Sequence, residues 1–139
     1  MKTTVLLIDD SRFLRKANEL ALARSGYSVL AAGDGEEGLH IACEKVPDLI
    51  VLDMMLPKMP GQQLLHELKN DPRTSGIPVI VLSSLPKSNA ERLRNEGAVA
   101  YFEKASLGID QGSSKLIEAI GNVLSSNRSA VAAAAKFSN

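Results

Sequence analysis

Short apolar runs alternate along the chain with longer stretches in which apolar side chains recur every three or four residues. The short runs are continuous and rich in Val, Ile and Leu, which is typical of parallel strands buried on both faces. We therefore expect five strands. They cover residues 3–8, 27–32, 48–53, 77–82 and 98–103.

The longer stretches carry signals for the start and end of helices. Ser11 and Asp34 can each cap the first turn of a helix that follows a strand. Gly26, Pro47 and Gly97 stand where helices are expected to stop. The five predicted helices cover residues 11–25, 34–45, 62–69, 88–96 and 113–124.

Alternating strands and helices predict an α/β fold with a parallel sheet between two layers of helices. The flavodoxin-like (βα)5 three-layer sandwich, with strand order 2-1-3-4-5, is the commonest solution at this size. Leu14, Ala17 and Ala21 are expected to turn the first helix toward the sheet. We predict one domain over residues 1–125, then a Ser/Ala-rich tail, 126–139, that extends the last helix or is disordered.

Composition narrows the class of protein. Lys plus Arg and Asp plus Glu both total 16, so the zero net charge gives no support for direct binding to nucleic acid or to an anionic membrane. Cys43 is the only cysteine, which excludes an internal disulfide and a cysteine-based zinc site. No run is long enough for membrane insertion, and the apolar stretch at 5–8 is too short for a signal peptide. We expect a cytoplasmic protein.

Acidic side chains follow two strands that should be neighbours. Asp9 and Asp10 come directly after the first strand, and Asp53 ends the third. Because ligands bind beyond the carboxyl ends of the strands in such sheets, these carboxylates are expected to converge there. Three clustered carboxylates repel one another unless one is protonated or a cation neutralises them. Mg²⁺, which binds carboxylates, waters and phosphate oxygens, suits the second solution.

Two further side chains are expected at the same edge of the sheet. Ser83 follows the fourth strand and offers a hydroxyl donor, while Lys104 follows the fifth and offers a positive charge. A carboxylate nucleophile, a divalent cation, a hydroxyl and a lysine are what transfer of a phosphoryl group onto an aspartate requires. The set therefore points to phosphoryl chemistry.

The order and spacing of these residues resemble the receiver domain of bacterial response regulators, over roughly residues 3–124. Five spaced motifs on alternating strands are far more specific than one acidic pair. The matching segments are Leu7–Ser11, Asp48–Pro57, Gly61, Pro78–Ser84 and Gly97–Lys104.

The resemblance implies a role for each acidic residue. Asp53 is expected to be the phosphoacceptor, and Asp10 and Asp53 to bind Mg²⁺ directly, together with the backbone carbonyl of Met55. Asp9 is expected to act mainly through a metal-bound water. Mn²⁺ can take the place of Mg²⁺ in such an oxygen site.

The resemblance also implies a switch. Ser83 is expected to bind the phosphoryl group and Lys104 to pair with it, while Tyr101 either turns inward on activation or simply packs. The fourth helix, fifth strand and fifth helix would form the face that binds a downstream protein target. The phosphoryl donor would be a sensor histidine kinase or a histidine phosphotransfer protein. Beside this face, Ala105 replaces the usual proline and the loop 105–112 is longer than usual.

Three other functions are open to the same topology. A pseudo-receiver would signal without phosphorylation, which the complete site argues against. A phosphatase of the haloacid-dehalogenase type needs an acid two residues after its nucleophile, where Met55 stands. A flavin-binding module needs a phosphate-cradling loop after the first strand, where Asp9 and Asp10 would repel the phosphate. We therefore predict a signalling phosphoacceptor that assists its own phosphorylation and dephosphorylation, rather than an enzyme.

Overall fold

Five parallel strands form a single sheet in the order β2-β1-β3-β4-β5. The structure is a computed structural model that describes residues 2–83, 94–103 and 115–126 of the chain. The order is the predicted flavodoxin-like one. The strands are β1 (Thr4–Ile8), β2 (Ser28–Ala32), β3 (Leu49–Asp53), β4 (Val79–Ser83) and β5 (Ala100–Glu103).

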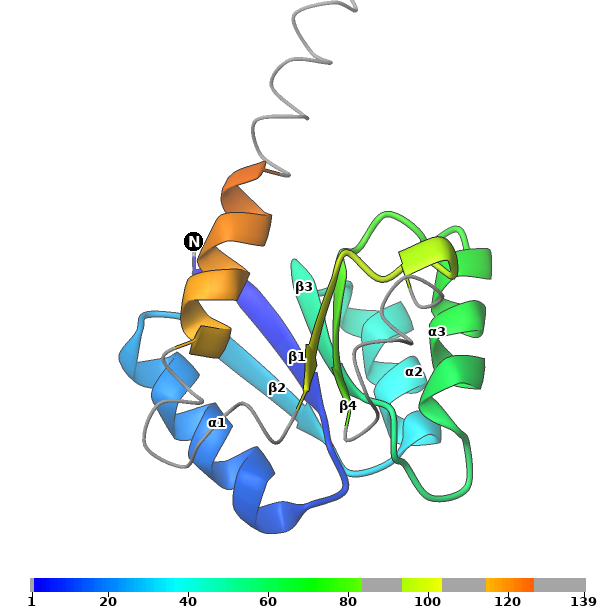
Figure 1. The fold of residues 1–139 in the computed structure, drawn as a ribbon, viewed down its shortest axis with the longest axis horizontal. Coiled ribbons are helices and arrows are strands. Elements are labelled where there is room, and N and C mark those ends of the chain that lie inside the picture. The colour runs from blue at the N-terminus through cyan, green and yellow to red at the C-terminus, as the bar shows by residue number, and fades with distance from the viewer. Residues whose placement is uncertain (1, 84–93, 104–114, 127–139) are drawn as a thin grey trace, which may run out of the picture.

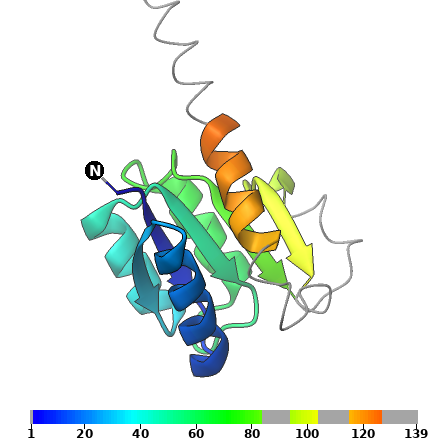
Figure 2. The same ribbon diagram turned by 90° about the vertical axis from the view of Figure 1, so that its left-hand side faces the viewer.

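Helices cover both faces of the sheet, which confirms the three-layer sandwich. α2 (Gly35–Lys45) and α3 (Gly61–Asn70) lie on one face. α1 (Arg12–Arg24) and a C-terminal helix, residues 115–126, lie on the other (Figures 1 and 2). Within the described ranges, every helix is too short or too polar to cross a membrane.

Side chains of successive strand residues enter two separate cores. In β3, Ile50 and Leu52 join the core under α2 and α3, while Leu49 and Val51 join the one under α1 and the C-terminal helix. All four side chains are fully buried. Burial on both faces explains why the strands are continuous apolar runs instead of alternating ones.

The prediction of which residues of α1 face the core is wrong at two of its three positions. Leu14 is 38% exposed and Ala17 is exposed, whereas Leu22 is buried and Arg15 partly buried. Ala21 is partly buried. The difference has a polar cause, because the Arg15 guanidinium turns inward to bond a backbone carbonyl at the end of β1. Hydrophobic periodicity places an arginine on the outside and so misses this contact.

Both predicted helix caps form. The Ser11 hydroxyl accepts from the backbone N–H of Leu14 at 3.3 Å. A carboxylate oxygen of Asp34 accepts from the backbone N–H of Glu37 at 2.9 Å. Each side chain satisfies one of the N–H groups that the first helical turn leaves without an intrahelical partner. The caps fix where α1 and α2 begin, just beyond the carboxyl ends of β1 and β2.

Several expectations fall outside the described residues. Of the predicted helix 88–96, residues 94–96 are described: residues 94 and 95 are helical and residue 96 lies in a turn. The start of the last helix at 113, the loop 105–112 with Ala105, and the segment 127–139 lie beyond the described part of the chain. The C-terminal helix is described up to residue 126.

Candidate functional site

Three aspartates meet where β1 and β3 end. Ile8 pairs with Leu52 in the parallel register, so the next residues, Asp9 and Asp53, leave the sheet side by side. One carboxylate oxygen each from Asp9, Asp10 and Asp53 lies within 4.8 Å of the others. The sequence predicted this convergence from strand order alone.

The three carboxylates differ in their exposure to solvent. Asp9 is 1% exposed and Asp53 is fully buried, whereas Asp10 is exposed. The cluster therefore has two carboxylates set into the protein and one at the surface. Within the described residues, the cluster reaches solvent through Asp10.

Asp9 is fixed by three hydrogen bonds. Its backbone N–H donates to the carbonyl of Ala32 at 3.1 Å, and its Oδ1 accepts from the backbone N–H of Ser11 at 2.9 Å. Its own carbonyl accepts from Nη1 of Arg15 at 2.8 Å. The contacts come from the end of β2 and from the start of α1, so the loop between β1 and α1 is held from two sides.

Asp53 is oriented by its own loop. Oδ1 of Asp53 accepts from the backbone N–H of Met55 at 3.0 Å. The following residue, Met54, donates its N–H to the carbonyl of Leu82 in β4 at 3.0 Å. The chain is therefore still hydrogen-bonded to the sheet one residue beyond β3. The Met55 side chain is 57% exposed above this turn.

The first residue of α3 packs directly on the turn after Asp53. A Cβ atom at Gly61 would lie 2.5 Å from Cα of Met54 and 2.9 Å from the carbonyl oxygen of Asp53. The Gly61 N–H donates to the Met54 carbonyl at 3.2 Å. Only glycine permits so close an approach between two backbones. The family resemblance of the sequence included Gly61 as a motif position, but the sequence alone gave no physical reason for a glycine there.

The remaining predicted site residues are described only in part. Ser83 is the last residue of β4, one position beyond Leu82, the partner of Asp53, so its backbone lies at the same edge. Lys104 lies outside the described residues. Tyr101, in β5, is partly buried and packs against the core on the α2–α3 side of the sheet. The phosphoryl-binding roles of Ser83 and Lys104 and the switch role of Tyr101 stay predictions.

The chemistry of the cluster fits a hard divalent cation. Two unit negative charges 4.8 Å apart, the upper limit for these oxygen atoms, would repel by about 3.5 kcal/mol at an effective dielectric constant of about 20. A divalent cation between the carboxylates would offset this repulsion, because each carboxylate would be attracted to the cation. Mg²⁺ takes one or two carboxylates and keeps several waters, which matches two buried acids beside an exposed one.

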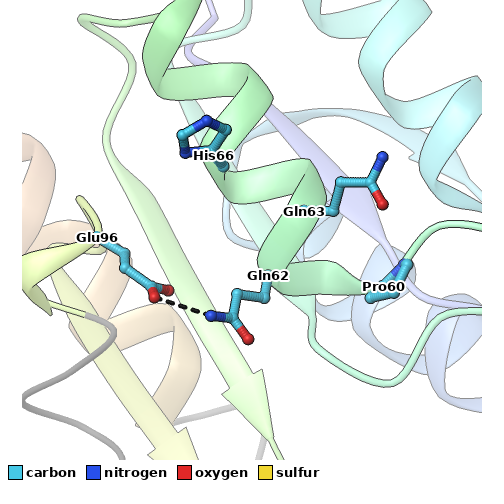
Figure 3. Close-up of a pocket in the computed structure, with 5 residues that line it drawn as sticks. All are labelled: Pro60, Gln62, Gln63, His66 and Glu96. Atoms are coloured by element: carbon cyan, nitrogen blue, oxygen red, sulfur yellow. Dashed lines mark hydrogen bonds between the residues drawn. The ribbon is translucent and has the colours of Figure 1, made fainter.

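A separate hollow of about 390 Å³ lies beside α3 and contains none of the three aspartates. The amide Nε2 of Gln62 donates to Oε1 of Glu96 at 2.9 Å (Figure 3). This bond ties the start of α3 to the turn that precedes β5. The hollow is lined by Pro60, Gln62, Gln63, His66 and Glu96.

Two side chains at the C-terminal end of α3 have shifted pKa values, and both shifts have structural causes. Burial lowers the pKa of Lys69, whose ammonium donates to the carbonyl of Ile77 at 2.7 Å. Hydrogen bonds from the side chain of Arg73 hold the pKa of Asp71 well below its usual range. Both contacts fix the connection between α3 and β4. Neither group lies in the acidic cluster.

Comparison with known proteins points to one family. A family model described as the response regulator receiver domain matches residues 5–120. The chain is 37% identical over 134 residues to the chemotaxis protein CheV3 of Helicobacter pylori, covering 88% of this chain and 41% of that protein. It is 43% identical over 108 residues to a gliding motility regulatory protein of Myxococcus xanthus, covering 76% and 14%. The chain thus spans less than half the length of either relative.

Solved structures agree with the sequence matches. A CheY-like response regulator receiver domain protein from Methanospirillum hungatei superposes with a TM-score of 0.82 at 25% identity, covering 93% of this chain and 98% of that one. A receiver domain protein from Clostridium thermocellum gives a TM-score of 0.79 at 29% identity, covering 91% and 97%. The likeness extends over nearly the whole of both structures.

Proposed function

Because the chain belongs to the response regulator receiver domain family, we propose that it is the phosphoacceptor of a two-component or phosphorelay pathway, modified on Asp53. The observation that carries the proposal is the meeting of Asp9, Asp10 and Asp53 at the carboxyl edge of the sheet. Asp53 is buried, like Asp9, but it is the one that ends a central strand. Its carboxylate is held there by a hydrogen bond from the Met55 N–H.

The proposed reaction moves one phosphoryl group. A carboxylate oxygen of Asp53 attacks the phosphorus of a phosphohistidine, and the new P–O bond forms as the P–N bond breaks, leaving the electron pair on the imidazole nitrogen. The N–H of Met55 orients the attacking carboxylate at 3.0 Å from Oδ1. The donor is a sensor histidine kinase or a histidine phosphotransfer protein.

The residues present fit Mg²⁺ as the resident cation, with Mn²⁺ as a substitute. Asp10, Asp53 and the carbonyl of Met55 would hold it directly, and Asp9 through a water. When bound, the ion supplies positive charge that offsets the negative charge of the phosphoryl oxygens. The chain would assist its own phosphorylation and dephosphorylation in this way without being an enzyme that acts on other molecules.

Phosphorylation would act as a local electrostatic switch. It adds about −1.5 to −2 charge units and three acceptor oxygens. We propose that Ser83 binds the phosphoryl group and that Lys104 forms an ion pair with it. The ring of Tyr101 would then turn inward. The packing around β5 and the C-terminal helix would shift between two populations and expose a changed surface to a downstream protein target.

The proposed setting is the cytoplasm, without membrane insertion and without direct contact to nucleic acid. The zero net charge supports only the last point, because it offers no overall attraction to nucleic acid. One relative, the DNA-binding regulator RpaA of Synechocystis, is 41% identical over 81 residues, which are 34% of its length. The DNA-binding activity is named for that longer protein, of which this chain matches about a third.

Acetyl phosphate with Mg²⁺ provides a direct test. The intact mass of the purified chain should rise by one phosphoryl group, and addition of EDTA beforehand should prevent the rise. Asp53→Asn should take up none, whereas Asp48→Asn, one residue before β3 begins, should be modified like the natural chain. An unmodified natural chain would instead favour a pseudo-receiver.

A further inference from the structure

Arg15 reaches from α1 into the loop that carries two of the three aspartates. Its Nη1 donates to the backbone carbonyl of Asp9 at 2.8 Å, and its side chain is partly buried. We propose that Arg15 is a positioning residue for the cation site, which fixes the peptide unit between Asp9 and Asp10. The proposal rests on the function proposed above and deepens it.

The peptide bond between Asp9 and Asp10 is planar. The carbonyl of Asp9 lies in the same rigid plane as the Cα atom of Asp10. Holding that oxygen therefore fixes one of the two peptide planes that meet at Cα of Asp10, and so restricts the directions in which its side chain can leave the backbone. Asp10 is exposed, so core packing cannot set its direction. Mg²⁺ demands a near-ideal octahedral arrangement, which makes its affinity sensitive to how its ligands are placed.

The loop after β2 leaves space for the guanidinium. A Cβ atom at Gly33 would lie 3.1 Å from Nη1 of Arg15 and 3.7 Å from its Cζ. Gly33 in turn donates its N–H to Oε2 of Glu37 at 3.4 Å, which anchors this loop to α2. Arg15 is thus held between the loops that follow β1 and β2. A guanidinium confined in this way can fix the carbonyl that it bonds.

Charge and geometry predict opposite effects for the loss of Arg15. A positive side chain near a cation site repels the cation, so removing the charge alone would tighten Mg²⁺ binding. Removing the hydrogen bond would release the Asp9–Asp10 peptide and weaken binding. Outer groups that orient metal ligands are commonly worth about 10–100-fold in affinity. The sign of the change therefore separates positioning from simple electrostatics.

The test measures the Mg²⁺ dissociation constant by isothermal titration calorimetry. Arg15→Met should raise it about 10-fold, and Arg15→Lys, which keeps one donor, should recover part of the loss. Arg12→Met removes an exposed arginine from the first turn of the same helix and should leave binding unchanged or slightly tighter.

Gly33→Ala tests the same claim should Arg15→Met fail to fold. The added methyl group would displace the guanidinium without deleting it, so Mg²⁺ affinity should fall less than in Arg15→Met but in the same direction. Equal or tighter Mg²⁺ binding by folded Arg15→Met or Gly33→Ala would overturn the positioning role while leaving the proposed function intact. Absence of Mg²⁺ binding by the natural chain would overturn both.

Discussion

At the scale of single residues, the acidic cluster combines buried and exposed carboxylates. Asp9 and Asp53 are buried, and each has a carboxylate oxygen that accepts a backbone N–H bond. Asp10 is exposed and lies within 4.8 Å of both. The exposed member is therefore the one whose charge can be removed without breaking a buried hydrogen bond. Its removal separates the repulsion within the cluster from the binding of a cation.

Asp10→Asn should raise the free energy of unfolding of the metal-free protein by about 1 kcal/mol, a value reduced from the full Coulomb term because Asp10 faces solvent. The same variant should lose the increase in the free energy of unfolding that we expect millimolar Mg²⁺ to give the natural chain. Urea unfolding with EDTA and with Mg²⁺ measures both effects.

Glu118→Gln is the matched control, since it removes an exposed charge from the C-terminal helix. It should leave the response to Mg²⁺ unchanged. A destabilised metal-free Asp10→Asn, or one that Mg²⁺ still stabilises fully, would show that the three carboxylates do not form one electrostatic unit.

At the scale of elements, α3 and β3 are joined by a backbone contact at the site. Gly61, the first residue of α3, has no room for a side chain against Met54 and Asp53. Gly61→Ala should lower the free energy of unfolding by about 1–3 kcal/mol, the usual cost of overpacking. It should also slow phosphorylation, because the turn that orients Asp53 must move.

Gly121→Ala gives a control of opposite sign. Gly121 lies within the C-terminal helix, and a Cβ atom there would meet nothing within 4 Å. This change should stabilise the protein by about 0.5–1 kcal/mol through helix propensity. Chemical denaturation compares the two variants, and equal effects of both would remove the claim that Gly61 is required by close packing.

Some of these elements and contacts could be predicted from the sequence, and others could not. Strand β3 was predictable because burial on both faces leaves a continuous apolar run that ends at Asp53. Strand order then sufficed to bring Asp9 and Asp53 together. The orientation of α1 was not predictable, because the contact of Arg15 with a backbone carbonyl leaves no periodic signal. The same holds for Gly61, whose restriction comes from residues distant along the chain.

At the scale of the whole molecule, two cores lie on either side of one sheet. The core under α1 and the C-terminal helix reaches Leu124, the last buried residue in the described ranges. The family model matches residues 5–120. We propose that the receiver unit ends at about residue 125 and that folding does not require residues 127–139.

Deletion of residues 127–139 should therefore shift the unfolding temperature by less than about 2 °C, equivalent to roughly 0.5 kcal/mol. The Mg²⁺ affinity should be unchanged. Differential scanning calorimetry measures the first and titration calorimetry the second. Leu124→Ala, which opens a cavity in the core, should cost about 2–5 kcal/mol in comparison. A large loss on deletion alone would place the tail within the folded unit.

Phosphorylation of Asp53, and not of Asp9 or Asp10, is the central claim about this protein. Borohydride reduces an aspartyl phosphate to homoserine, so tandem mass spectrometry after treatment with acetyl phosphate, Mg²⁺ and borohydride locates the modified residue. The account predicts homoserine at position 53 and unchanged aspartate at positions 9 and 10. Homoserine at position 9 or 10, or at none of the three, would contradict it.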